Sequence, residues 1–261
     1  MIALLILVLL ALAAALWWAV RGWAARGLTL AFAALLLFPA PFWSLRYHPP
    51  FPAPFPAGAA LPVQTLSWPL AGVRHLRLGL AASVGSLSVS PGQTRSVRSR
   101  AFARVSAQFY RAGAAASLEL RLPRPGLGSA AFRPTPWSVA VDPKVPLDLT
   151  VQGGVGQLRL QLVGLDLRDL SVRDGVGVTA IAFPRQGRIR ARIRGGVGDL
   201  TLRIPAGLAV DLRWQPGMGP LRLPRSWDLR GSRYRSPGWS LAKNRLRLDL
   251  TGGLGPVAVQ Q

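Results

Sequence analysis

Glycine-rich turns are the part of this sequence whose residue spacing could do chemistry. The stretch GGVGDLTLRIP at residues 195–205 fits three roles. Such a turn can cradle a phosphate, hold calcium, or bend a β-chain where no side chain fits. A dinucleotide-binding G-x-G-x-x-G turn opens a helix. Here a strand-like run follows Gly198, no glycine stands at the required offset and there is no Walker lysine. The sequence therefore disfavours nucleotide binding.

Calcium binding would require a carboxylate that recurs with the glycines. Calcium-binding β-rolls repeat Gly-Gly-x-Gly-x-Asp, whereas Asp199 follows the last glycine directly. The equivalent positions in the other copies are Gln157, Val178, Pro220 and Pro256. We therefore interpret Asp199 as a turn or surface residue, and we expect neither a metal nor a cofactor.

Acid–base groups are few. The two histidines are His48 and His75, and no carboxylate motif stands near His75 in the sequence. The only glutamate, Glu119, alternates with Arg121, which favours a surface or cross-strand ion pair. The densest acidic cluster is interleaved with two arginines, which favours charge neutralisation over a metal site: Asp166, Arg168, Asp169, Arg173 and Asp174. The chain has no cysteine, which excludes thiolate catalysis. We expect no enzymatic activity, and an unrecognised envelope enzyme is the remaining alternative.

Arginine dominates the charge of the chain. The formal net charge is +22, and Lys144 and Lys243 are the only lysines. Arg188, Arg190, Arg192 and Arg194 recur at every second position, so on a strand they share one face. Stacked strands would extend this ladder with Arg159 and Arg203. The ladder is either a solvated face that reflects composition, or a site for anionic lipid headgroups, wall polymers or glycans. Nucleic acid is disfavoured because no aromatic stacking motif interrupts the basic residues.

The elements that must position these residues are β-strands. Apolar residues alternate with polar ones, and Gly and Pro punctuate the runs, which predicts an all-β body. The predicted strands are 73–80, 86–90, 103–110, 117–122, 146–151, 157–162, 188–193, 199–204, 245–250 and 256–259.

The glycines recur with a fixed period. The second glycines of four Gly-x-Gly units stand at 156, 177, 198 and 219, which is 21 residues apart each time. The last unit follows 36 residues later, so the intervening stretch is interpreted as an insertion. This period predicts a β-solenoid or β-roll with rungs of about 21 residues, and an ordinary β-sandwich is the alternative. The predicted corners are Gly85, Gly154, Gly156, Gly175, Gly177, Gly196, Gly198, Gly217, Gly219, Gly253 and Gly255. The apolar residue between two glycines is expected to point into the core.

The amino-terminal residues predict a membrane anchor. Residues 2–20 are uncharged and 28–45 are similarly apolar, so residues 1–46 are interpreted as a two-helix transmembrane hairpin in the lipid bilayer. No basic residue precedes the first run, which disfavours a cleaved signal peptide. Arg21 and Arg26 in the short loop predict a cytoplasmic loop and a carboxy-terminal body outside the cell membrane. Residues 47–63 form a Pro-rich stalk, and residues 64–261 form the repeat domain, with 64–142 and 143–261 as two sub-blocks.

The combination resembles a bacterial family. Two apolar segments precede strands reading WPLAGVRHLRLGLAASVGSLSVSPG and recurring GGVG-x-LxL units. This pattern is similar to the toast-rack or adhesin-type β-domains, including the carboxy-terminal domain of LiaF-like cell-wall-active antibiotic response proteins. The resemblance implies a membrane-tethered, non-enzymatic scaffold, and in some relatives a partner such as a membrane sensor kinase. It carries over no functional residue. We expect a scaffold for envelope interaction or regulation, with polyanion or anionic-lipid binding by the arginine ladder as the alternative.

Overall fold

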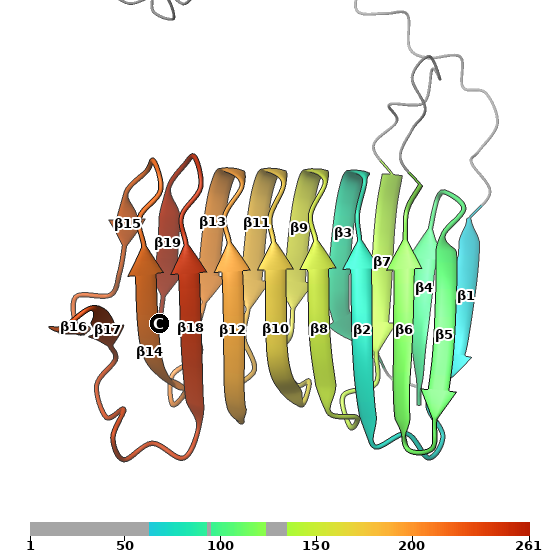
Figure 1. The fold of residues 1–261 in the computed structure, drawn as a ribbon, viewed down its shortest axis with the longest axis horizontal. Helices are drawn as coiled ribbons and strands as arrows, with labels where there is room; N and C mark the ends of the chain where they lie inside the picture. The colour runs from blue at the N-terminus through green and yellow to red at the C-terminus, as the bar shows by residue number, and fades with distance from the viewer. Residues whose placement is uncertain (1–62, 93–94, 124–134) are drawn as a thin grey trace, which may run out of the picture. The chain divides into compact units, whose positions relative to one another are not determined.

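The computed structural model describes residues 63–92, 95–123 and 135–261, whose regular elements are all β-strands (Figure 1). The all-β prediction is confirmed for this part of the chain. The expected hairpin over 1–46, and the expected stalk apart from residue 63, lie outside the described residues. No helix long and apolar enough to cross a membrane occurs in these three ranges. Residues 61–261 form one compact unit.

Two sheets make up this unit. Sheet A has the strand order β1-β4-β7-β3-β9-β11-β13-β19-β15. Its strands are β1 (Gln64–Pro69), β3 (Val84–Pro91), β4 (Ser96–Ala101), β7 (Thr135–Val141), β9 (Val155–Gln161), β11 (Val176–Ala182), β13 (Val197–Arg203), β15 (Leu221–Arg222) and β19 (Val257–Gln260).

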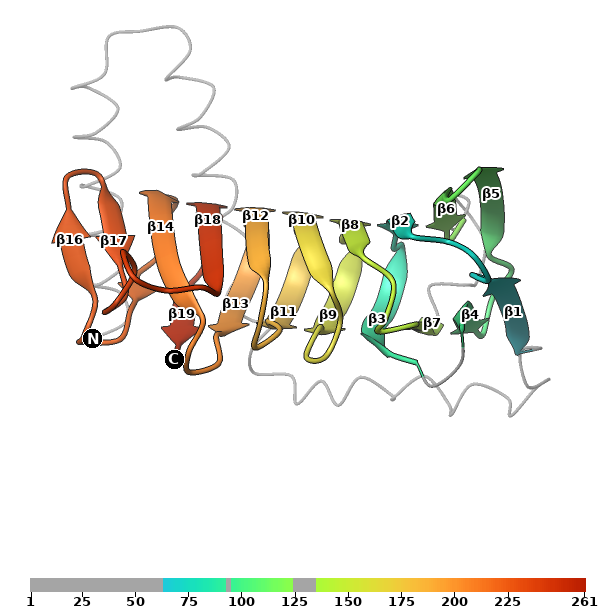
Figure 2. The same ribbon diagram turned by 90° about the horizontal axis from the view of Figure 1, so that it is seen from below.

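Sheet B lies against sheet A, as the view along the strands shows (Figure 2). Its strand order is β16-β17-β14-β18-β12-β10-β8-β2-β6-β5. Its strands are β2 (His75–Ala81), β5 (Ser106–Ala112), β6 (Ala115–Arg121), β8 (Leu147–Gln152), β10 (Leu167–Arg173), β12 (Arg188–Arg194), β14 (Ala209–Gln215), β16 (Asp228–Arg230), β17 (Arg233–Arg235) and β18 (Arg245–Thr251).

Repeated pairs of strands form the middle of the unit. In each pair, which we call a rung, one strand lies in sheet B and the next lies in sheet A. The chain runs up β8 in sheet B, turns through two glycines and descends β9 in sheet A, and the next two rungs repeat this path (Figure 1). Neighbouring rungs pair in parallel, so residues 21 apart face each other, as Val155, Val176 and Val197 do. Residues 64–142 and 143–261 share both sheets, because β2 pairs with both β6 and β8 in sheet B, and β3 pairs with both β7 and β9 in sheet A.

Apolar columns between the sheets form the core. Period-two alternation turns every second residue inward, and the parallel register stacks these residues from rung to rung. One column in sheet B consists of Leu118, Leu78, Leu149, Leu170, Ala191, Leu248 and Leu212. Its counterpart in sheet A consists of Val139, Val89, Leu160, Ile181, Leu202 and Val259. All of these side chains are buried.

The rungs are not stacked in chain order at either end. At the carboxy-terminal end, β18 lies between β12 and β14, although it follows both in the sequence. At the other end, β2 lies between β8 and β6, although it precedes both. The first rung in the sequence, β2–β3, and the last, β18–β19, therefore each have strands paired on both sides. In space the second glycines follow the order 85, 156, 177, 198, 255 and 219, so the 21-residue step from Gly198 to Gly219 does not make them neighbours.

Antiparallel strands close the amino-terminal end of both sheets and the carboxy-terminal end of sheet B, whereas sheet A ends at β15, which is parallel to β19. Strands β1, β4 and β5 flank the amino-terminal end, and the β16–β17 hairpin flanks β14 at the other. An open sheet edge presents unpaired amides and carbonyls that can pair with another chain. The short antiparallel additions therefore leave only short or strongly exposed strands, β5 and β16, at the edges of sheet B.

The prediction for the apolar residue between the glycines is wrong. Val155, Val176, Val197, Met218 and Leu254 are exposed. Alternation from the buried Leu158 and Leu160 places Val155 on the outer side of the sheet. At the second glycine of each corner, the backbone of the neighbouring rung leaves no space for a side chain.

Candidate functional site

The predicted corner glycines form two columns at one edge of the two sheets. The first column contains Gly85, Gly156, Gly177, Gly198, Gly255 and Gly219, each with a positive φ between 127° and 158°. At Gly177, a Cβ atom would overlap the carbonyl oxygen of Gly156. The same overlap recurs along the column, so the corners combine a left-handed backbone with a close approach between rungs.

The second column contains the first glycines of the units: Gly154, Gly175, Gly196, Gly253 and Gly217. Their backbones do not have positive φ, yet a Cβ at Gly196 would overlap the carbonyl oxygen of Gly175. Amide groups at the corner bond to the neighbouring rung, for example Val197 N to the Gly175 oxygen at 2.8 Å. The amides of Val155, Val176 and Val197 are therefore bonded to the backbone of the neighbouring rung and are not available to a phosphate.

The four ladder arginines lie on the outer face of sheet B. Arg188, Arg190, Arg192 and Arg194 are exposed and alternate with buried Ile189, Ala191 and Ile193 along β12. The expected extension through Arg159 and Arg203 is wrong, because these residues belong to β9 and β13 of sheet A. The ladder is instead extended by β18, on which Arg245 faces Arg188 and Arg247 faces Arg190. We call these six residues of β12 and β18 the basic face.

Acidic residues do not neutralise the basic face. Within the described residues, Arg188, Arg190, Arg192, Arg194 and Arg247 form no ion pair and donate no side-chain hydrogen bond. Asp169 and Asp249 flank the ladder in register, opposite Arg190 and Arg192. The basic face therefore keeps an excess of unpaired guanidinium groups in this part of the chain.

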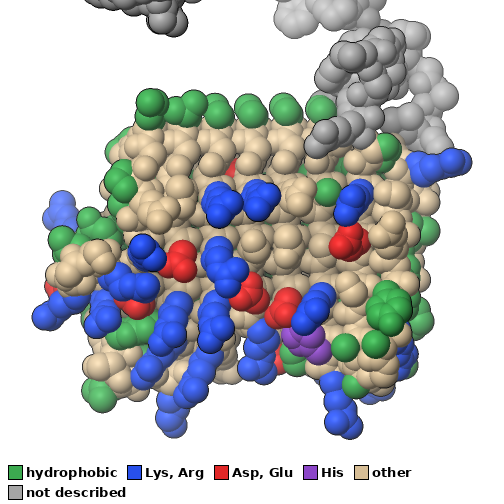
Figure 3. Space-filling model, in the orientation of Figure 1, with side chains coloured by type: hydrophobic (Ala, Val, Ile, Leu, Met, Phe, Trp, Pro, Cys, Tyr) green, Lys and Arg blue, Asp and Glu red, His purple; other side chains and the backbone are tan. Residues whose placement is uncertain are grey.

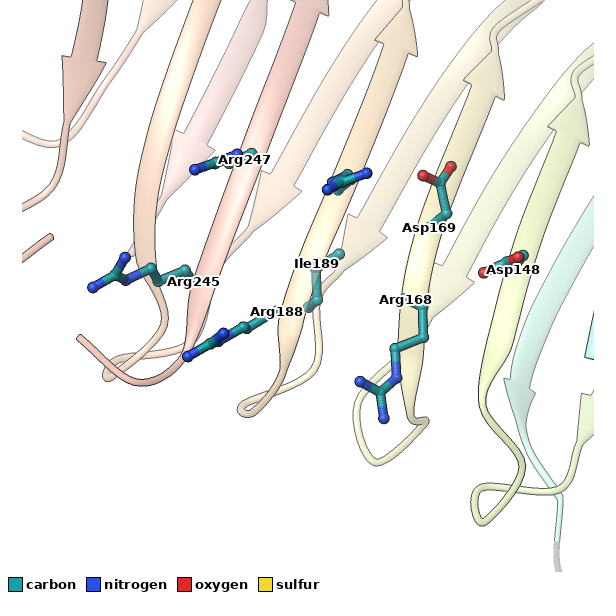
Figure 4. Close-up of a pocket in the computed structure, with 8 residues that line it drawn as sticks. Asp148, Arg168, Asp169, Arg188, Ile189, Arg245 and Arg247 are labelled. Atoms are coloured by element: carbon teal, nitrogen blue, oxygen red, sulfur yellow. The ribbon is translucent and has the colours of Figure 1, made fainter. Parts of the chain in front are cut away.

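A shallow hollow of about 520 Å³ opens on this face. Arg188, Arg190, Arg245 and Arg247 line one side of it, and Asp148 and Asp169 line the other (Figure 4). The lining residues come from β8, β10, β12 and β18, so the hollow exists only because the rungs stack. Its rows of guanidinium groups can bind carboxylate, sulfate or phosphate groups in a bidentate manner.

Arg245 is held in place by the loop that precedes it. Its Nε donates to the carbonyl oxygen of Ala242 at 2.7 Å, and its Nη2 donates to the oxygen of Ser240 at 3.0 Å. The guanidinium lies 5.5 Å from the centre of the Trp239 ring, within cation–π range. The insertion between β14 and β18 thus fixes one charge of the basic face.

Two acid–base interpretations are tested by the contacts. Sequence reasoning found no carboxylate near His75, but Asp148 Oδ2 lies 2.8 Å from its Nε2. That proximity arises from the pairing of β2 with β8 and leaves no signal in local sequence. The expected ion pair between Arg121 and Glu119 is present at 2.8 Å, on an exposed surface.

The acidic cluster divides into separate roles. Arg168 pairs with Asp166 at 2.9 Å, as charge neutralisation predicts. Asp174 instead accepts hydrogen bonds from Thr179 Oγ1 at 2.6 Å and from the Gly175 amide at 2.9 Å. Asp199 is exposed. No group of three or more His, Asp or Glu residues that could hold a metal ion occurs among the residues that the structure describes.

The sequence of this domain matches a known protein family. The family of the N-terminal domain of toast_rack, DUF2154, matches residues 60–203, which is more than half of the chain. The chain belongs to the toast-rack family. The rest of the toast-rack chain, from residue 204 onward, contains the insertion and the last rung, which is enclosed by its neighbours.

One solved structure shows the same fold outside this chain. A candidate cell adhesion protein from Clostridium sporogenes ATCC 15579 superposes on the toast-rack chain with a TM-score of 0.68 and 20% sequence identity, covering 77% of this chain and 99% of that one. A candidate adhesin from Bacteroides fragilis NCTC 9343 has 12% identity and a TM-score of 0.28, covering 76% and 97%. No curated protein matches the chain. At these identities the first comparison shows the fold alone.

Proposed function

We propose that the toast-rack domain is a non-enzymatic scaffold that binds an anionic envelope polymer through its basic face. The observation that carries this proposal is the register of β12 with β18, which sets Arg188 against Arg245 and Arg190 against Arg247. None of these four arginines forms an ion pair among the described residues. Wall polymers and acidic glycans carry repeated anionic groups. Such a repeat matches a repeated array of cations.

The spacing of this array supports a polymeric ligand. Alternate residues on one strand are about 6.6 Å apart, and neighbouring strands are about 4.8 Å apart. The array stands on two central strands that are hydrogen-bonded on both sides, β12 between β10 and β18, and β18 between β12 and β14. The strands fix the backbone positions of the array before the ligand arrives, so no backbone has to be ordered on binding.

The test is retention of the detergent-solubilised full chain on heparin as salt is raised. Changing Arg188, Arg190, Arg192 and Arg194 to Ser should move elution to markedly lower salt, because fewer counterions are released on binding. The matched control changes four exposed arginines of sheet A, Arg98, Arg100, Arg159 and Arg203, and removes the same charge from the other face. Equal shifts for the two variants would mean that retention reports net charge alone and would overturn the proposal.

We propose further that residues 1–46 anchor the protein in the cell membrane as a two-helix hairpin, with the carboxy-terminal domain outside. The apolar runs at 2–20 and 28–45 and the two arginines between them support this topology. Reporter fusions after Gln261 test it. Activity of an extracytoplasmic reporter is expected, and activity of a cytoplasmic reporter would contradict the proposed localisation.

A further inference from the structure

A continuous apolar row lies along the edge where the glycine corners turn. It consists of Val155, Val176, Val197, Leu254 and Met218, with exposed fractions between 45% and 77%, and it is continued by half-buried Val84. Each member pairs in register with the next, in the spatial order 84, 155, 176, 197, 254 and 218. We call this row the apolar ridge. It is visible along the upper edge in Figure 3.

Packing does not require apolar residues at the ridge. The side chains between paired glycines point away from the core, so a polar residue would fit there at no steric cost. The ridge nevertheless holds valine, leucine or methionine at every one of its six positions. Six rungs spaced by about 4.8 Å give a straight apolar line of roughly 24 Å. Contiguous apolar surface of this kind marks an interaction site.

The opposite edge of the sheets has a different character. Its turns contain Asp166, Arg185 and Gln186 together with positive-φ Gly164, Gly187 and Gly207. Val163 is exposed to 46%, close to the value of a ridge valine, but it lies in a turn outside the paired strands. The apolar line is therefore a property of one edge.

The chain enters the domain at the ridge edge. Strand β1 is antiparallel to β4, which is antiparallel to β7, which is parallel to β3, so β1 and β3 run in the same direction. Gln64 lies in the row of Leu87, three residues beyond Val84 of the ridge. The first residues of the described domain, Val63 and Gln64, therefore lie toward this edge, and the segments proposed to anchor the protein precede them in the sequence.

Basic residues border the ridge on the side of sheet B. Arg173 and Arg194 are exposed, face each other in register and stand three residues before Val176 and Val197. Neither forms an ion pair within the described residues. An apolar line beside unpaired arginines is the arrangement that inserts shallowly into a bilayer and contacts anionic headgroups.

We propose that the apolar ridge rests on the surface of the anionic lipid bilayer in which the protein is anchored. The strands then stand upright on the membrane, and the basic face is directed sideways. This inference rests on the proposed membrane anchoring. A ridge one residue wide is too narrow to supply the roughly 800 Å² per partner of a stable protein interface, which disfavours a second copy as the occupant.

The absence of cysteine in the chain allows a direct test by site-specific labelling. Val176→Cys, Val197→Cys and, at the opposite edge, Val163→Cys are each labelled with an environment-sensitive fluorophore in the full chain. The protein is reconstituted into phosphatidylglycerol-containing liposomes with and without nitroxide-labelled lipids. A label on the ridge should shift to the blue and be quenched about threefold more than the label at Val163. Equal quenching at the two edges would overturn the proposal.

Further outcomes separate the ridge from the anchor. Failure of the chain to float with liposomes would overturn the anchoring and this inference together. Flotation without quenching on the ridge would overturn this inference alone. A blue shift without lipid quenching would identify a protein occupant and would also overturn it. Replacing Val155, Val176 and Val197 with threonine keeps the β-branched shape, and it should lower quenching of a label at Leu254→Cys while the melting temperature is retained.

Discussion

The backbone N–H of Gly198 donates a hydrogen bond to the carbonyl oxygen of Leu254, 2.7 Å away. Leu254 belongs to the last rung, which enters the stack between two rungs that precede it in the sequence. The carboxy-terminal segment is therefore an internal part of the sheets. Its strands supply the partners for β12 and β14 in sheet B and for β13 and β15 in sheet A.

Removing a core side chain from the enclosed rung should destabilise the domain strongly. Leu248 is fully buried in the column between Ala191 and Leu212. We expect Leu248→Ala to lower the free energy of unfolding by about 2–5 kcal/mol through lost burial and a cavity. Leu241, which is 89% exposed, provides the control. Urea unfolding measures both variants, and a similar loss in Leu241→Ala would contradict the assignment.

Three alanine substitutions separate the effect of a positive φ from the effect of a close approach between rungs. Gly207 has a positive φ but open space around its Cβ position. Gly207→Ala should therefore lower the free energy of unfolding by about 1–2 kcal/mol through backbone strain alone. Gly196 lacks the positive φ but closely approaches the Gly175 oxygen, and Gly196→Ala should cost about 3 kcal/mol or more. Gly198 combines both demands, and Gly198→Ala should be the most damaging. Thermal melting ranks the three variants, and a neutral Gly198→Ala would refute the corner geometry.

Removing the acceptor of the hydrogen bond between Thr179 and Asp174 should destabilise the domain more than removing the donor does. Thr179 is almost fully buried, between Leu158 and Leu200 in the inward column of sheet A. Asp174→Ala leaves the buried Thr179 hydroxyl without its acceptor and should lower the free energy of unfolding by about 1–3 kcal/mol. Thr179→Val leaves an apolar side chain among apolar neighbours and should be close to neutral. Chemical denaturation of both single variants and the double variant provides the comparison, and equal losses in the two single variants would contradict this account.

Asp211 joins the β16–β17 hairpin to the stack. Its side chain is only 8% exposed, and its two oxygens accept from Arg233 at 3.0 Å and from Arg235 at 3.2 Å. Replacing both arginines with alanine leaves a buried carboxylate unpaired and should cost up to about 3–5 kcal/mol. Asp211→Ala should cost less, because both arginines reach solvent. Hydrogen exchange of β14 and β17 amides follows the loosening, and the reverse order of effects would contradict the prediction.

Local sequence was sufficient for the elements with clean alternation. The run RIRARIR appears in the structure as β12 with alternating burial, and the runs at 157–162 and 199–204 correspond to β9 and β13. No predicted run covers β1, β4, β7, β10, β11, β14, β15, β16 or β17, and β10 and β11 illustrate why. The register of β10 shifts beside Arg168, which breaks its alternation, and β11 carries the polar Thr179 at a buried position. Thr179 can be buried only because Asp174 satisfies it, a contact that no period reveals.

The candidate site also has features that local sequence predicts and features that it does not. Alternation alone determined that Arg188, Arg190, Arg192 and Arg194 share a face, and the recurring glycines identified the corners. The same alternation, applied from Leu158 back to Val155, would have placed the apolar residues outside. Sequence could not identify Arg245 and Arg247 as the neighbours of the ladder, because strand pairing over long separations is independent of local pattern.

The sequence by itself determined an all-β body, its glycine corners and the arginine ladder, because period-two alternation and glycine backbone geometry are local properties. The tertiary structure alone decided which rungs are neighbours. It enclosed the first and last rungs, set Arg245 and Arg247 beside β12, and aligned the apolar ridge on the edge where the chain enters. Those relations depend on the burial of strand edges and apolar columns between rungs, which is a property of the whole stack.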